Sequence, residues 1–319
     1  MTLAEETGAL TTDGETPEQK FTRQAREMWD EPLPRRTRLL AAEYGIHPSK
    51  RLGQSFLIND RAANRLADIA AEFDPPGVTE VGGGLGALTV PLIRRLPRAR
   101  FVVYEVDPAL CRVLADLLSP VARRCWVHCR DFIQCSGDDT PATDDWVLVG
   151  NLPYSVTTPI LERIFTGARR WRAVLVMVQR EFAERMAAGP GSRTYGALSV
   201  FSCYHCQQIE RVMDLSPGSF WPKPKVASVA VLIRLRPGPP ECVTQPVAFR
   251  AVVRAAFGYR RKTLLRGLST AGVLGASEDQ VRAAIALAGL DPQQRAETVS
   301  FEQFAALADS LARVLDWQG

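Results

Sequence analysis

Short apolar segments alternate regularly with amphipathic segments between about residues 77 and 188, and this alternation constrains the fold more than any other feature. The apolar segments have strand length, and the amphipathic ones have the spacing of helices. Strands that alternate with helices predict a mainly parallel sheet covered by helices on both faces. The predicted strands are VTEV, RFVVYEVD, RCWVHCRD, WVLVG and RAVLVMVQ, and the helices between and after them are LTVPLIRRL, PALCRVLADLL, TTPILERIF and REFAERMAA.

Two further apolar segments, around residues 196–206 and 226–235, are also predicted strands and bring the sheet to seven. The Pro/Gly-rich sequence RPGPPE then marks a boundary near residue 238, and only helical patterns follow it. Residues 1–36 are rich in Thr, Glu and Pro, a composition typical of disorder. We therefore expect an acidic, disordered tail over residues 1–36, an α/β domain over 37–237 and a small helical domain over 238–319.

The charge distribution separates the two ends of the chain. The formal net charge is +4, yet residues 1–20 hold five acids against Lys20 alone. No acid occurs between Glu241 and Glu278, where Arg250, Arg254, Arg260, Arg261, Lys262 and Arg266 accumulate. Such a basic stripe suits a nucleic-acid backbone, but a solvated helix face explains it about as well when it is considered alone.

The sequence also bears on compartment and on metal binding. No apolar run approaches membrane-spanning length and no secretory signal precedes the first helix, so a cytoplasmic protein is expected. Seven cysteines in 319 residues do not form a disulfide framework. Two clusters contain metal-ligand residue types, one at Cys125, His128 and Cys129 and one at Cys203 and Cys206. On the predicted strand the last two would face opposite sides, so we expect buried thiols and no metal.

Glycines and acids follow the first three predicted strands. The sequence EVGGGLGALT places Gly82, Gly84 and Gly86 between a strand and a helix, where absent side chains allow a close approach to a ligand. The second strand ends at Glu105, which could accept both hydroxyls of a ribose, and the third at Asp131 and Phe132, which could bind and cover an adenine. Both NAD and S-adenosylmethionine contain that adenosine, so this pattern leaves the two open.

The segment VLVGNLPYSVTTP, residues 147–159, favours the second cofactor. The exocyclic N6 of adenine is a poor nucleophile because its lone pair is delocalised into the ring. The Asn151 side-chain oxygen and the Leu152 carbonyl could accept the two amine hydrogens and localise that lone pair. Pro153 restricts Leu152 to an extended conformation, and Tyr154 could stack on the base. Methyl transfer to adenine is the chemistry that this loop suits.

With these motifs in place, the sequence resembles the rRNA adenine N6-dimethyltransferases of the KsgA and Erm types from about Thr37 to the C-terminus. KRLGQSFLIND, EVGGGLGALT, YEVD, GNLPYSVTTPIL, VQREFAERMAAGPGSRTYGALSVF and FWPKPKVASVAV follow in the order of that family. The helical part, with YRRKTLL and LDPQQRAETVSFEQFAALA, is more similar to the small-subunit rRNA branch than to the antibiotic-resistance branch.

The resemblance implies a seven-stranded Rossmann-like methyltransferase domain with a C-terminal all-helical domain, and it implies roles for individual residues. S-adenosyl-L-methionine would contact Gln54, Ser55, Leu57, Gly82, Gly84, Gly86, Glu105, Val106, Asp131, Phe132 and Asn151. The target adenine would be held by Asn151, Leu152, Pro153 and Tyr154, with Phe220 stacked on its other face. RNA would contact Lys223, Lys225, Arg250, Arg254, Arg260, Arg261 and Lys262.

The implied activity is the transfer of two methyl groups to N6 of adenine in small-subunit rRNA by a monomer that binds the precursor of that subunit. The family usually has Asn at Ser55 and often Pro at Gly83, and we expect the second difference to have no consequence. Three alternatives stay open: a large-subunit rRNA methylase that confers antibiotic resistance, a ribosome assembly factor with little activity, and a nicotinamide oxidoreductase. Intact Gly82, Glu105 and Asn151 argue against the second, and no catalytic Tyr-Lys or His site supports the third.

Overall fold

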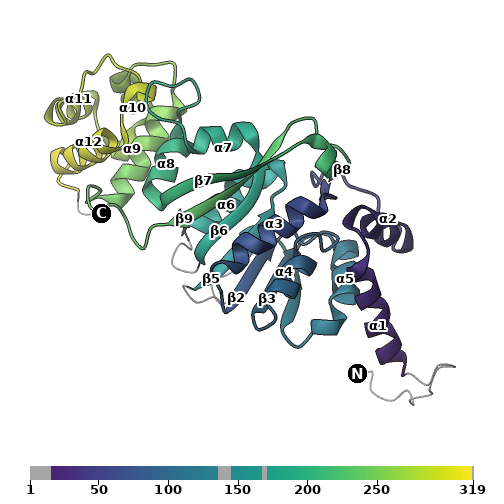
Figure 1. Ribbon diagram of the computed structural model, residues 1–319. Coiled ribbons are helices and arrows are strands. Elements are labelled where there is room, and N and C mark those ends of the chain that lie inside the picture. The colour runs from purple at the N-terminus through teal and green to yellow at the C-terminus, as the bar shows by residue number, and fades with distance from the viewer. Residues whose placement is uncertain (1–15, 136–144, 167–170, 318–319) are drawn as a thin grey trace, which may run out of the picture. The chain divides into compact units, whose positions relative to one another are not determined.

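The computed structural model describes residues 16–135, 145–166 and 171–317 (Figure 1). The chain forms two compact units. The first unit comprises residues up to 179 together with 211–232, and the second comprises 180–210 and 233–319. The sequence placed one boundary near residue 238, whereas the structure assigns residues 180–210 to the same unit as the C-terminal helices.

A seven-stranded sheet has the strand order β4-β3-β2-β5-β6-β9-β7. The strands β4, β3, β2, β5 and β6 pair in parallel, so their carboxyl ends lie at one edge. The strand order reverses at β2, and such a reversal opens a crevice beside the carboxyl ends of the strands. The strands span Gly77–Val81 (β2), Arg100–Glu105 (β3), Cys125–Cys129 (β4), Trp146–Asn151 (β5), Trp171–Gln179 (β6), Cys206–Leu215 (β7) and Ser228–Leu235 (β9).

A separate two-stranded sheet joins β1 and β8, which pair antiparallel. These strands span Phe56–Leu57 and Phe220–Trp221. The helices span Pro17–Asp30 (α1), Leu33–Glu43 (α2), Asp60–Ala71 (α3), Thr89–Arg95 (α4), Pro108–Leu117 (α5), Thr157–Thr166 (α6), Arg180–Met186 (α7), Ala197–His205 (α8), Pro246–Gly258 (α9), Leu264–Ala271 (α10), Glu278–Leu287 (α11) and Phe301–Val314 (α12). None of the helices within the described ranges is long and apolar enough to cross a membrane.

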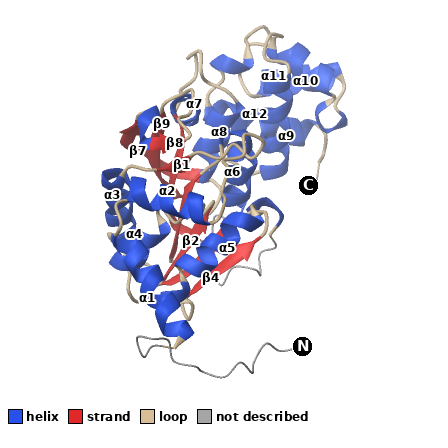
Figure 2. Cartoon of the chain, turned by 90° about the vertical axis from the view of Figure 1, so that its right-hand side faces the viewer, coloured by secondary structure: helices blue, strands red, loops and turns tan. Residues whose placement is uncertain are grey.

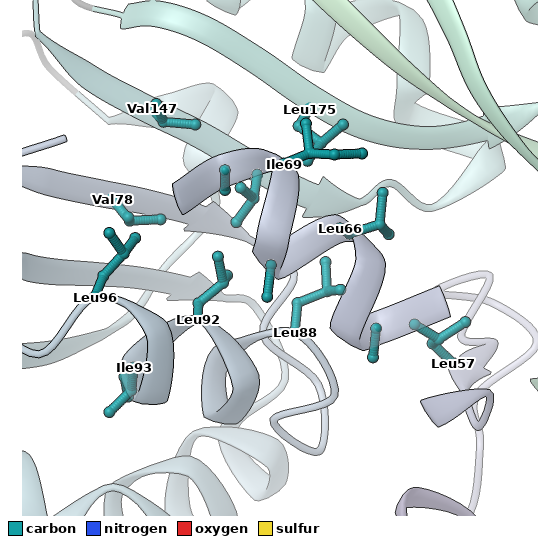
Figure 3. Packing of buried hydrophobic residues seen from close by; sticks show 14 of the residues in the cluster. Leu57, Leu66, Ile69, Val78, Leu88, Leu92, Ile93, Leu96, Val147 and Leu175 are labelled. Carbon is teal, nitrogen blue, oxygen red and sulfur yellow. The ribbon is translucent and has the colours of Figure 1, made fainter. Parts of the chain in front are cut away.

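Helices α3 and α4 pack on the central strands through aliphatic side chains (Figure 3). Leu66 and Ile69 of α3 and Leu92 of α4 meet Val78 of β2 and its neighbours, and all of them are buried. Asn59 caps α3 by accepting the N–H of Ala62. Since burial of one such side chain contributes about 1.5–3 kcal/mol, this contact fixes the helices on the sheet and with them the loops at its edge.

Helices α1 and α2 occupy residues 17–43, so the prediction of a disordered tail over residues 1–36 is wrong for residues 17–30 and 33–36; residues 1–15 lie outside the described ranges. The sequence contains the reason, because Thr16 and Gln19 form a capping box and Pro17 follows the cap. Trp29 also donates its indole N–H to the carbonyl of Leu117 at 2.8 Å, which joins α1 to the end of α5 (Figure 2). The prediction of disorder rested on composition, which takes account of neither the capping box nor the Trp29 hydrogen bond.

The segment predicted as a strand over residues 196–206 is helix α8, and strand β7 begins only at Cys206. Val200 and Tyr204 are both buried and lie four residues apart, the spacing of one helix face. The Tyr204 ring stacks on Phe249 of α9, with the centroids 5.3 Å apart. Tertiary packing against α9 therefore prevails over the strand propensity of the β-branched and aromatic residues. The predicted number of seven strands remains correct.

The second unit has its own apolar core, built from α8 and the C-terminal helices. The Tyr195 hydroxyl donates to the Val299 carbonyl at 2.9 Å within that core. Ser300 and Gln303 form a capping box at the start of α12, and Ser277 and Gln280 form another at α11. The predicted helical character of the C-terminal residues is confirmed.

Glu80 lies in the middle of β2, is 2% exposed, and has one carboxylate oxygen without a hydrogen-bond partner among the described residues. Burial raises the pKa of Glu80 to about 8, the hydroxyl of Thr89 offsets part of the rise, and the charge of Glu105 adds to it. Burying an unpaired carboxylate is costly, so this group holds a proton in the folded protein at neutral pH.

This shift predicts a pH-dependent stability. The folded state binds the proton more tightly than the unfolded state, so the contribution is complete below about pH 4.5 and is lost as the pH rises toward 8. Relative to Glu80→Gln, the unfolding free energy of the wild type should fall between pH 5 and pH 8 by about 1 kcal/mol or more. Urea titrations at several pH values measure it. A difference that stays constant with pH would contradict a buried, protonated Glu80.

Candidate functional site

A cavity of about 220 Å³ lies at the carboxyl ends of β2, β3 and β5, within the first unit. The segments that line it are the loop before β1, the glycine loop after β2, and the residues that end or follow β3, β4 and β5. Its predicted lining residues are Gln54, Ser55, Gly82, Gly84, Glu105, Val106, Asp131, Phe132, Asn151, Leu152, Pro153 and Tyr154. The structure therefore brings together residues that lie up to a hundred positions apart in the sequence.

The glycine loop takes a backbone conformation that side chains oppose. Gly82, Gly84 and Gly86 have φ of 78°, 56° and 73°. Only glycine adopts this left-handed region without a steric cost. The N–H of Gly82 donates to the Tyr104 carbonyl at 2.8 Å, which holds the start of the loop against the end of β3.

Gly83 has an ordinary φ but no room for a side chain. A Cβ there would lie 2.4 Å from Cγ1 of Val103 and 2.9 Å from Cδ1 of Leu114. In this chain, the packing of these two side chains therefore depends on glycine at position 83.

The Glu105 carboxylate at the end of β3 organises the backbone around it. One oxygen accepts the N–H of Gly84 at 2.9 Å, and the other accepts those of Val106 and Asp107 at 2.9 and 3.1 Å. Burial raises the pKa of Glu105, and these three N–H groups lower it in part. A carboxylate offers about four lone-pair positions, so one acceptor position is left beside the cavity. Glu105 therefore has room for one further hydrogen bond, whereas the expectation from the sequence was two from a ribose.

The loop before β1 is tied to the same strand end. The Gln54 side chain accepts the N–H of Ser49 and donates to the Asp107 carboxylate, both at 2.7 Å. Asp107 also caps α5 by accepting the N–H of Ala109. The Ser55 hydroxyl donates to the carbonyl of Pro222 at 2.9 Å, so its side chain is already engaged.

Asn151 ends β5 with a fixed amide orientation. Its Nδ2 donates to the Ser55 carbonyl at 2.8 Å. Since a carbonyl can only accept, the amide nitrogen must face Ser55, and the side-chain oxygen is left as the acceptor. The Asn151 amide is thus oriented by a backbone carbonyl that lies nearly a hundred residues earlier in the chain.

The residues after Asn151 are also held in place. The Leu152 N–H donates to the Met177 carbonyl at 3.2 Å, and the Pro153 carbonyl accepts from Thr157 Oγ1 at 3.0 Å. The Tyr154 hydroxyl shares a hydrogen bond with Ser228 at the start of β9, and burial raises the pKa of Tyr154. The loop therefore presents a rigid polar edge to the cavity.

Asp131 and Phe132 follow β4 at the opposite side of the sheet's parallel part. Asp131 accepts the N–H of Ile133 at 2.9 Å and so caps a short 3-10 helix. The Phe132 ring contacts Tyr104 edge-on, with centroids 5.3 Å apart. An acid and an apolar ring thus lie side by side on the cavity wall.

Three residues expected at the site do not line the cavity. Leu57 and Phe220 are paired across β1 and β8, are each 1% exposed, and belong to the apolar core under α3. Gly86 faces Leu117, whose Cδ2 would lie 2.6 Å from a Cβ there. The structure gives Phe220 no surface on which a base could stack. The partly buried Trp221 packs near Phe56, with centroids 6.0 Å apart.

Arg51 and Arg130 line the cavity but were not selected from the sequence. Each is exposed and lies close to a residue that was selected, Arg130 directly before Asp131 and Arg51 three residues before Gln54. Their closeness in sequence to predicted site residues was the one signal that could have identified them as cavity residues. They add positive charge to the mouth of an otherwise mostly uncharged cavity.

The predicted RNA-contacting residues are all exposed. Arg250 and Arg254 lie one turn apart on α9, whose other face is buried. Arg260 is paired with Glu297 at 3.0 Å, so part of its charge is neutralised, whereas Arg261 beside it is exposed. Lys262 Nζ donates to Thr270 Oγ1 at 3.2 Å. Lys223 and Lys225 lie between β8 and β9 in the first unit.

Among the described residues, no group of His, Cys, Asp and Glu has the arrangement of a metal site.

Comparison with known proteins gives consistent matches. Residues 47–313 match the family model described as ribosomal RNA adenine dimethylase. A protein of Anoxybacillus flavithermus named ribosomal RNA small subunit methyltransferase A is 39% identical over 283 residues, covering 87% of this chain and 95% of that protein. A protein of the same name from Bacillus thuringiensis is 35% identical over 291 residues, covering 89% of this chain and 98% of that protein.

Solved structures agree with the fold. The 23S rRNA methyltransferase ErmE superposes with a TM-score of 0.57 at 25% identity, covering 80% of this chain and 99% of that one. A dimethyladenosine transferase from Plasmodium falciparum has a TM-score of 0.62 at 24% identity, covering 79% of this chain and 95% of that one. The Rossmann-like fold predicted from the sequence is confirmed.

The glycine loop yields a prediction with a matched control. Gly84→Ala puts a Cβ 3.2 Å from Phe56 at φ 56°, whereas Gly45→Ala meets the same left-handed strain, at φ 60°, in open space. Both should lose about 1–2 kcal/mol of unfolding free energy. Only Gly84→Ala should weaken S-adenosylmethionine binding in a calorimetric titration, by about tenfold for each 1.4 kcal/mol of misfit. Equal affinities for the two variants would show that the loop does not bind the methyl donor.

Proposed function

The chain belongs to the ribosomal RNA adenine dimethylase family, and from this membership we propose that it transfers methyl groups from S-adenosylmethionine to N6 of adenine in small-subunit rRNA. The chain is an enzyme, an S-adenosylmethionine-dependent rRNA adenine methyltransferase. One observation carries the assignment of the site: the adenosine-type residues Glu105, Asp131 and Phe132 and the polar loop from Asn151 to Tyr154 line a single cavity.

The residues present fit the methyl donor. Glu105 retains an acceptor position for a ribose hydroxyl, Asp131 and Phe132 suit an adenine, and the glycine loop gives backbone access. We assign the methionine end to Gln54, Ser55, Gly82 and Gly84, and the exposed Arg51 offers a positive charge nearby for a carboxylate. When bound, the donor supplies an electrophilic methyl group on a sulfonium.

The Asn151 loop would prepare the acceptor nitrogen. With one N–H of its Nδ2 donated to the Ser55 carbonyl, Asn151 has a fixed amide orientation, and its oxygen would accept one hydrogen of the adenine amine. The Leu152 carbonyl would accept the second, and both bonds favour a nitrogen whose lone pair is localised. The hydrogen bonds of Leu152 and Pro153 hold these acceptors in place before RNA binds, and such pre-orientation can contribute effective molarities of order 10⁵ M.

Tyr154 is the aromatic group that we assign to the target base. Its hydroxyl contact with Ser228 fixes the ring, and it lies on the cavity wall. Stacking of an unpaired base on an aromatic ring contributes about 1–3 kcal/mol, which offsets the cost of removing the base from its helix. Since Phe220 is buried in the core, we do not carry its stacking role forward.

Arg250, Arg254 and Arg261 in the second unit and Lys223 and Lys225 in the first are exposed cations suited to RNA phosphates. Relatives named for the small subunit are 35–39% identical over most of the chain, compared with 25% for ErmE, which supports a small-subunit target. We further propose that the protein acts on a precursor of that subunit in the cytoplasm.

Replacement of Asn151 by Ala tests the assigned role of its oxygen. Methyl transfer to RNA should fall by at least about a hundredfold, because an acceptor placed for the reacting group is lost. S-adenosylmethionine affinity should change little. Transfer is measured with radiolabelled donor, and affinity by calorimetry. Asn64→Ala, at an exposed position on α3, is the control. Near-normal transfer by Asn151→Ala would remove the residue from the mechanism.

The choice of substrate has its own test. Purified protein should methylate small-subunit particles from cells that lack the enzyme, and mass spectrometry of the RNA should find dimethyladenosine. Protein-free large-subunit RNA should accept little methyl under the same conditions. The reverse preference would favour the resistance-type activity, and donor binding without transfer to either RNA would favour an assembly factor.

A further inference from the structure

Helices α1 and α2 precede residues 47–313, which match the family model, yet they contact the glycine loop. Leu40 and Ala41 of α2 share an apolar cluster with Leu85 of that loop and with Leu117 of α5. Trp29 of α1 packs against the same cluster. The residues that cover the loop on this side are therefore supplied by the part of the chain that the family model does not include.

Arg36 lies at the centre of this contact and is 4% exposed. Its two terminal nitrogens donate to backbone carbonyls, one to Trp29 at 3.4 Å and the other to Gly86 at 3.3 Å. Its Nε has no hydrogen-bond partner among the described residues. A guanidinium has five N–H donors, so this one is poorly satisfied for a buried cation.

The electrostatic surroundings do not explain why a cation is buried there. Burial lowers the pKa of Arg36 to about 10, Asp60 raises it in part, and Arg94 lowers it further. Asp60 already accepts the N–H of Leu33 at 2.9 Å. A buried charge with such partners gives little net stability, and an apolar side chain of similar size is often as stable or more so.

A cavity of about 350 Å³ beside Arg36 could suggest an anion site, but its walls oppose one. Asp30, Glu31 and Asp60 line it together with three arginines, and two of these are already paired, Arg94 with Asp30 and Arg95 with Asp68, so the walls carry no excess of positive charge. The hydrogen bonds of Arg36 to the backbone are the remaining specific feature.

Gly86 is the point at which the glycine loop enters α4. Its carbonyl accepts the N–H of Val90 at 3.2 Å in the first turn of that helix and accepts from Arg36 as well. Its own N–H donates to Gly83 at 2.9 Å, so a shift of Gly86 is transmitted to the part of the loop that lines the cavity. A charged donor on this carbonyl thus fixes the loop from outside the cavity.

We propose that Arg36 is a positioning residue, through which helices α1 and α2 hold the glycine loop in the conformation that binds S-adenosylmethionine. The proposal rests on the proposed function for the identity of the ligand. Its structural part, that Arg36 orders the loop, is independent of any ligand.

The test compares Arg36→Met with Thr37→Val. Methionine keeps the volume and helix propensity of the site and removes the donors. Thr37 is its buried neighbour, 1% exposed, and its hydroxyl has no partner among the described residues, so Thr37→Val changes α2 without removing a contact to the loop. Hydrogen exchange of the ligand-free proteins should be faster at residues 82–88 in Arg36→Met alone, with the rates in β5 and β6 unchanged.

In the same set, calorimetry should show S-adenosylmethionine binding about tenfold weaker for Arg36→Met, which is what one hydrogen bond from a charged donor commonly contributes. Arg36→Lys keeps the charge but has a single donor nitrogen, which cannot reach both carbonyls, so it should recover part of the affinity. Transfer at saturating S-adenosylmethionine should stay near that of the wild type. An unchanged rate of hydrogen exchange at residues 82–88 in Arg36→Met would overturn the proposal. Faster exchange throughout the first unit would also overturn it, because it would indicate a general loss of stability. If wild-type protein did not bind the donor, the proposed function would fail while the exchange comparison still decided the role of Arg36.

Discussion

The Glu105 carboxylate is the interaction on which the site depends. It collects three backbone N–H groups, one from the glycine loop after β2 and two from the residues that end β3. Because β2 and β3 are adjacent and parallel, the glycine loop and the residues after β3 lie at the same edge of the sheet. The buried carboxylate of Glu105 then holds these two segments at a fixed separation. Gln54 then joins the loop before β1 to Asp107 at the same strand end. The cavity exists because one carboxylate is satisfied by backbone from two strand ends.

Three buried ionisable groups surround this edge, and each carries a desolvation cost. Glu80 and Glu105 have raised pKa values and Arg36 a lowered one, with burial as the first cause in every case. Proteins seldom bury such groups without partners. These three groups lie near the glycine loop, and perturbed ionisable groups of this kind are typical of sites that need a rigid backbone and fixed dipoles. Their burial lowers the free energy of unfolding, while their hydrogen bonds hold the loop in place.

Strand ends and glycine spacing are local patterns, and from them the sequence predicted the parallel sheet and the cavity residues Glu105, Asp131, Phe132 and Asn151. Helical patterns predicted the C-terminal helices, whereas Gln54 and Ser55 were implied only by the family resemblance. The sequence could not predict that Phe220 pairs with Leu57 in the core, since that depends on the antiparallel contact of β8 with a strand formed far earlier in the chain. It also assigned α8 to a strand, because the packing of Tyr204 on Phe249 is not local. The capping box at Thr16 was readable but was outweighed by composition.

The central claim is that the methyl donor and an unstacked adenine meet beside the oxygen of Asn151. A crystal structure of the protein with S-adenosylhomocysteine and a short RNA tests it most directly. The account predicts the ribose of the donor at Glu105, its adenine between Asp131 and Phe132, and the target base against Tyr154 with its amine at Asn151. Electron density for the nucleoside elsewhere, or a target base held away from Asn151, would contradict it.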